Sequence, residues 1–107
     1  MSFDPDKAFD ALVRAGEAWA DAEAAADLLE ETKKSVLAKL MNDSPHSSIA
    51  GKEMSALADP EYRKHIEGMV SARKAANKAR VRYDSAKVLA ELRRSQESTR
   101  RAEMAIR

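Results

Sequence analysis

The residues best suited by type and spacing to bind another molecule are basic. The stretch RKAANKARVR, residues 73–82, holds five basic side chains in ten positions and no acidic one. Clustered lysines and arginines bind the phosphates of nucleic acids, so one interpretation is a phosphate-binding face. The other is that they pair with acidic residues of the same chain and thereby align two helices. The five are Arg73, Lys74, Lys78, Arg80 and Arg82.

A second basic group lies near the end of the chain. Its arginines are accompanied by only two acids, Glu97 and Glu103, and no aromatic residue lies among them on which a base could stack. We predict that this group contacts DNA through its phosphates. The alternative is a solvated helix end with local pairs such as Arg93–Glu97. The predicted nucleic-acid-binding residues are Arg93, Arg94, Arg100 and Arg101.

The sequence carries no recognisable pattern of catalytic residues. It has no cysteine, which excludes disulfides, thiolate metal sites and cysteine nucleophiles. It also lacks a glycine-rich phosphate loop and the paired-histidine motif of zinc hydrolases. The histidines are His46 and His65, and Glu61 precedes His65 by four positions, whereas di-iron proteins use a Glu-x-x-His spacing. We therefore expect no enzyme activity, no metal, no cofactor and no pocket for a small-molecule substrate.

Composition indicates one helical domain covering residues 1–107. Charged residues make up 35% of the chain and aromatic residues 5%, and glycine and proline number three each, which is typical of helical proteins. The start, MSFDPDKAF, lacks the apolar segment of a secretory signal. No stretch approaches the roughly 18 apolar residues of a membrane span. We expect a soluble cytoplasmic protein with no membrane partner.

Start and stop signals predict three helices. Asp4-Pro5-Asp6 is a helix start, because aspartate caps free amides and proline fits the first turn, and Asp59-Pro60-Glu61 repeats it. The first helix should end near Met41, because Asn42 can adopt the left-handed conformation and Pro45 disfavours a helical Ser44. The fold class is therefore all-α. The predicted helices span about residues 5–41, 49–58 and 60–104.

Apolar residues on the first and last helices recur in steps of three and four, which is coiled-coil spacing. The two helices should form an antiparallel hairpin, and Trp19 and Tyr83 should fill the seam between them, with Trp19 shielded from water. The first seam consists of Phe9, Leu12, Ala15, Trp19, Ala22, Ala26, Leu29, Val36 and Leu40. The facing seam consists of Tyr62, Met69, Ala72, Ala76, Ala79, Tyr83, Ala86 and Ala90.

The last helix carries a second apolar stripe that a hairpin cannot cover. The short helix should place Ala50, Met54 and Leu57 on one side, so as to cap the end of a bundle. We therefore predict a homo-oligomer, most simply a two-fold dimer that forms a four-helix bundle. The predicted oligomer interface contains Val70, Val81, Val88 and Leu92.

The distribution of charge supports antiparallel pairing. Residues 1–59 carry 6 basic and 12 acidic side chains, whereas residues 60–107 carry 13 basic and 6 acidic ones. If the turn is centred near residue 51, facing positions have numbers that add up to about 102. Residues 73–82 then face residues 20–29, which contain Asp21, Glu23 and Asp27. This arrangement favours internal pairing for the stretch RKAANKARVR.

Three segments resemble small helical proteins encoded by bacteriophages and prophages, often near replication or recombination genes. They are EWADAEAAADLLEETKKSVLAKLM, DPEYRKHIEGMVSARKAANKARVRYDSAK and RRSQESTRRAEM. The resemblance implies a non-enzymatic accessory protein of phage DNA metabolism that acts by binding. Two alternatives stay open. One is a protein–protein interaction module that inhibits or adapts a phage or host enzyme, and the other is a virion assembly protein.

Overall fold

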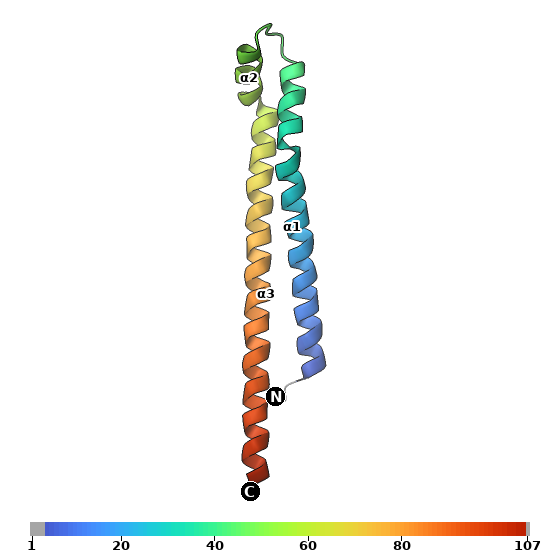
Figure 1. Cartoon of the computed structure of the whole chain (residues 1–107), viewed down its shortest axis with the longest axis vertical. Coiled ribbons are helices and arrows are strands. Elements are labelled where there is room, and N and C mark those ends of the chain that lie inside the picture. The colour runs from blue at the N-terminus through green and yellow to red at the C-terminus, as the bar shows by residue number, and fades with distance from the viewer. Residues whose placement is uncertain (1–3, 107) are drawn as a thin grey trace. The chain divides into compact units, whose positions relative to one another are not determined.

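The computed structural model describes residues 4–106, and all regular secondary structure in that range is helical. The prediction of an all-α helical hairpin with a short helix at the turn is confirmed, and the helix ends agree with the predicted ones to within two residues (Figure 1). The helices are α1 (Pro5–Asn42), α2 (Ile49–Leu57) and α3 (Pro60–Ile106).

Both long helices begin at the predicted aspartate caps. The Asp4 side chain accepts hydrogen bonds from the backbone amides of Asp6 at 3.0 Å and Lys7 at 3.3 Å. The Asp59 side chain accepts one from the amide of Glu61 at 2.8 Å. These bonds satisfy amides of the first turn, which have no partner inside a helix.

The end of α1 differs from its prediction. Asn42 is not left-handed, because no non-glycine residue of the described range has a positive φ angle. Instead the last turn continues in the right-handed sense. The Asp43 amide donates to the Lys39 carbonyl at 3.0 Å, and the Ser44 amide donates to the Met41 carbonyl at 3.2 Å. These bonds satisfy the final carbonyls, so a left-handed residue is not needed.

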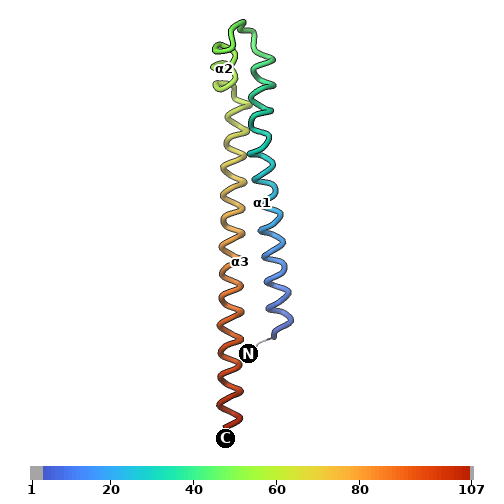
Figure 2. Tube along the Cα trace, viewed as in Figure 1, coloured from blue at the N-terminus to red at the C-terminus, as the bar shows by residue number. Residues whose placement is uncertain are grey.

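The described residues form two compact units. Residues 21–76 form a helical hairpin from the second half of α1, the whole of α2 and the first part of α3 (Figure 2). The Lys39 ammonium lies 3.3 Å from the Glu61 carboxylate across this hairpin. Most of the buried side chains are small, so the helices approach closely but remove little apolar area from water. They are Ala26, Leu40, Ala56 and Ala76.

The inward face of α2 was predicted wrongly. Ala56 is 1% exposed, whereas Met54 is 72% exposed and Leu57 47%. Only Ala58 and Asp59 separate α2 from α3, so this short connection fixes which side of α2 turns inward. The periodicity of nine residues could not reveal that rotation.

The second unit consists of residues 4–20 and 77–106. Trp19 of α1 packs on Tyr83 of α3, with ring centroids 5.4 Å apart and planes tilted by 34°. This contact matches the predicted register. Trp19 is only half-buried, however, because its neighbours are small and Ala79 is the one buried residue among those described in this unit. Phe9 is 65% exposed and does not close the seam as expected.

Candidate nucleic-acid interface

Arg73 of α3 is the centre of an ion-pair cluster with three carboxylates of α1. Its Nη2 lies 2.7 Å from Asp27, its Nη1 lies 2.8 Å from Glu23, and its Nε lies 3.0 Å from Glu30. The three acids are four and three positions apart, so they lie on one side of α1. Hydrogen bonds from the carboxylates of Glu30, Asp27 and Glu23 raise the pKa of Arg73 further above its ordinary value. Arg73 therefore serves internal pairing, as predicted.

The rest of the stretch 73–82 behaves differently. Its other four cations are exposed, and none of them forms an ion pair with any residue in the range 4–106. Of the acids expected opposite them, Glu23 and Asp27 pair with Arg73, and Asp21 is exposed and forms no ion pair with a described residue. Internal pairing thus holds for one cation and was wrongly predicted for four. They are Lys74, Lys78, Arg80 and Arg82.

The end of α3 carries two rows of cations. The first row steps by seven residues, which separates successive members by about 10.5 Å along the helix. The second row, on the other side of the α1-facing seam, contains Arg93 and Arg100. All of these side chains are exposed. The first row contains Arg80, Lys87, Arg94 and Arg101.

Glu97 neutralises part of this surface. Its carboxylate lies 2.9 Å from Arg100 and 3.8 Å from Arg101. The pair Arg93–Glu97, offered above as the alternative to DNA contact, does not form. Glu97 turns to the two arginines that follow it, which leaves Arg93 and Arg94 without an ion pair among the described residues.

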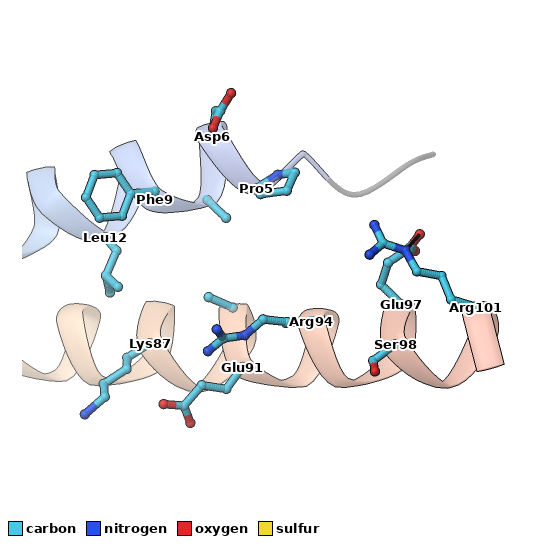
Figure 3. A pocket seen from close by; sticks show the side chains of 12 residues that line it. Pro5, Asp6, Phe9, Leu12, Lys87, Glu91, Arg94, Glu97, Ser98 and Arg101 are labelled. Carbon is cyan, nitrogen blue, oxygen red and sulfur yellow. Dashed lines mark ion pairs between the residues drawn. The ribbon is translucent and has the colours of Figure 1, made fainter.

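A cleft of about 730 Å³ lies within the unit formed by residues 4–20 and 77–106, although no pocket was expected from the sequence (Figure 3). Leu12 points toward α3, and Glu97 and Arg101 point toward α1. Opposite Phe9 and Leu12, α3 offers Ala90 and charged residues, so no large apolar side chain closes the gap. The cleft is lined by Pro5, Asp6, Ala8, Phe9, Leu12, Lys87, Ala90, Glu91, Arg94, Glu97, Ser98 and Arg101.

The histidines hold no metal site in the described range. Within residues 4–106 no three histidine, aspartate or glutamate side chains lie where they could hold a metal ion. His65 instead contacts the helix opposite, with its Nε2 atom 2.8 Å from the Leu29 carbonyl oxygen. His46 lies exposed in the loop before α2.

The predicted oligomer-interface residues point away from the partner helix. Each is more than half exposed, which agrees with a stripe that the chain itself leaves uncovered. They are Val70, Val81, Val88 and Leu92.

None of the helices in residues 4–106 has the length and apolar character needed to cross a membrane. Comparisons with protein-family models, with curated proteins and with solved structures returned no match.

Proposed function

We propose that this chain is a non-enzymatic, homo-oligomeric accessory protein of phage DNA metabolism, acting in the host cytoplasm and contacting DNA through the end of α3. The proposal rests on the charge of that helix segment. Residues 77–106 contain eight basic and four acidic side chains. Arg93 and Arg94 are exposed and form no ion pair with a described residue, so they can meet phosphates without losing an internal partner.

The contact should be electrostatic and independent of base sequence. No phenylalanine, tyrosine or tryptophan occurs after Tyr83, so residues 84–106 offer no aromatic ring on which bases could stack. Arginines that only touch phosphates position a protein on the duplex without reading its sequence. The DNA affinity should therefore depend strongly on salt and weakly on the choice of duplex.

The test is the slope of DNA affinity against salt concentration. Four phosphate contacts predict a slope of about −3.6 in a log–log plot, which is a loss of about 150-fold between about 50 and about 200 mM salt. Replacing each of the four arginines with glutamine should flatten the slope by about 0.9 per residue. The variant changes Arg93, Arg94, Arg100 and Arg101 together.

A matched control removes the same charge from the other unit. It replaces four exposed cations with glutamine, and it should keep most of the DNA affinity if the end of α3 is the contact surface. Equal losses in both variants would mean that only bulk charge matters, and no binding by the unmodified protein at low salt would refute the proposal. The control changes Lys34, Arg63, Lys64 and Lys74.

One observation favours the protein–protein module as the second candidate. The outward side of α2 exposes Ile49 (77%) and Met54 (72%) with Leu57 beside them. Methionine and isoleucine at an exposed helix surface suit an apolar partner protein. A protein that binds no DNA but loses a protein partner on Met54→Glu would support this candidate.

A further inference from the structure

The outer side of α3 carries a seam that includes three of the four predicted interface residues, Val81, Val88 and Leu92, and continues beyond Leu92, whereas Val70 lies outside it. Eight positions follow one another in steps of four and three, the spacing of a coiled-coil seam. Twelve of the thirty residues from 77 to 106 are charged, yet none of the eight is. The outer seam consists of Val81, Ser85, Val88, Leu92, Ser95, Thr99, Ala102 and Ile106.

Every residue of the outer seam is exposed, whereas the apolar residues on the side of α3 that faces α1 are not. Tyr83, Ala86 and Ala90 of that other side are half-buried. The Thr99 hydroxyl donates to the Ser95 carbonyl at 3.0 Å, so its polar group is satisfied within the helix and its methyl group is free to pack. The outer seam can therefore be covered with little polar cost.

The outer seam ends where charge begins. The next positions of the same stripe toward the start of α3 are Lys78 and Lys74, both exposed and without an ion pair in the described range. A partner helix that continued over them would have to cover two lysines. The part of α3 that a partner helix can cover therefore begins at Val81.

We propose that a second copy of this chain covers the outer seam, with its own α3 running antiparallel. Antiparallel pairing places residues opposite one another when their numbers add up to about 187. Each pair of facing seam residues, one from each copy, forms a layer of the interface. Every layer combines a larger side chain with a smaller one or two of moderate size, so the side chains of the two helices can interdigitate. The layers are Val81 with Ile106, Ser85 with Ala102, Val88 with Thr99, and Leu92 with Ser95.

Charge complementarity selects this orientation. Arg82 and Glu103 flank the outer seam on one side, both are exposed, and neither forms an ion pair within residues 4–106. In the antiparallel dimer Arg82 of each copy lies opposite Glu103 of the other, so the symmetry gives two such pairs. On the other side of the seam, Asp84 and Glu91 meet uncharged residues, so no like charges are opposed.

A parallel dimer lacks these advantages. In a parallel dimer, a residue beside the seam of one copy faces the residue five positions later in the other copy. Asp84 would then face Leu89, and Glu91 would face Gln96. Each seam residue would also face its own copy, so that Ser85 and Ser95 would form layers with almost no apolar area. Nothing in the sequence compensates for these losses.

This inference rests on the oligomeric part of the proposed function and not on DNA binding. A dimer with the stated register that binds no DNA would refute the DNA contact and leave the inference intact. A monomeric protein with a salt-dependent DNA affinity would refute the dimer and leave the DNA contact intact.

The decisive experiment is thiol pairing, because the natural chain has no cysteine. Two full-length variants, Val88→Cys and Thr99→Cys, are mixed in glutathione buffer, and one of them carries a mass tag. The antiparallel register brings the two different cysteines together and keeps identical ones apart. At least about nine tenths of the disulfide-linked chains should then be the mixed pair, since a disulfide forms only between closely placed Cβ atoms.

The other outcomes overturn the inference. Disulfides of Val88→Cys with itself would show a parallel dimer, and a statistical mixture would show no defined register. A charge test runs alongside: Arg82→Glu should weaken the dimer about tenfold, and adding Glu103→Arg should restore it. Arg80→Glu, which changes the same charge off the seam, should leave the dimer unchanged. A dimer indifferent to Arg82→Glu would also count against the register.

Discussion

Arg73 shows how one side chain can set the alignment of two helices. A guanidinium has donors in a rigid fork, and this one reaches three carboxylates at 2.7 to 3.0 Å. A lysine offers a single ammonium and cannot match the three acids in the same way. The neighbouring Lys74 and Lys78 reach no acid among residues 4–106, so Arg73 alone of the five cations in residues 73–82 pairs with α1.

The first prediction follows from that cluster. Arg73→Met should lower the melting temperature by several degrees, because it leaves Glu23, Asp27 and Glu30 close together without their shared cation. Arg73→Lys should recover only part of the loss. Lys74→Met removes the same charge from an exposed site and should leave melting unchanged. Equal melting of the Arg73→Met and Lys74→Met variants, measured by circular dichroism, would contradict the assignment.

The second prediction compares two glycines. A Cβ atom at Gly68 would meet no atom within 4 Å, so Gly68→Ala should stabilise the protein by about 1 kcal/mol through helix propensity. At Gly51 a Cβ atom would lie 2.9 Å from the Ser48 hydroxyl, which caps α2 by accepting from the Gly51 amide. Gly51→Ala should therefore destabilise by about 1 kcal/mol. Urea unfolding measures both, and the same sign for both changes would be inconsistent with these environments.

At the scale of the elements, the helix starts could be predicted because their causes are local. Asp4 and Asp59 each cap the amides that follow them, and three letters of sequence suffice to see it. The seam of α3 could be predicted for the same reason, since Ala76 and Ala79 are buried as their spacing indicates.

Other features of the elements could not be predicted because they depend on two segments at once. The rotation of α2 is set by its connection to α3, which buries Ala56 in place of Met54. The cleft beside Phe9 and Leu12 arises because α3 offers small or charged residues opposite them. Glu97 pairs with Arg100 and Arg101 and not with Arg93. Sequence spacing alone allows either pairing. The sequence therefore indicated which basic residues gather at the end of α3, but not which of them form ion pairs.

The third prediction concerns the protection of α1 and α3 along their lengths. In α1 the buried residues are Ala26 and Leu40, whereas residues 5–12 line the open cleft. Amide hydrogens open where few buried contacts hold a helix, so residues 5–12 should exchange faster than residues 22–40. Hydrogen exchange at low protein concentration measures this. Uniform protection along α1 would mean that the cleft is closed in solution.

At the scale of the whole chain, the amount of exposed surface is the main observation. The chain exposes 8455 Å², whereas a globular monomer of its mass exposes about 5,900 Å². None of its large side chains is fully buried in the described range. A chain with so little core is marginal alone, and a second copy on the outer seam would bury the valines and leucine that are now exposed.

Molar mass in solution tests the central claim of an oligomeric binding protein most directly. The chain mass is 11.8 kDa, and light scattering at micromolar concentration should give twice that value or more. Leu92→Asp places a charge in the middle of the outer seam and should shift the mass toward that of a single chain. Val13→Asp, on an exposed site of α1, is the matched control and should not. A mass of one chain at every concentration, with the helices intact by circular dichroism, would contradict the account.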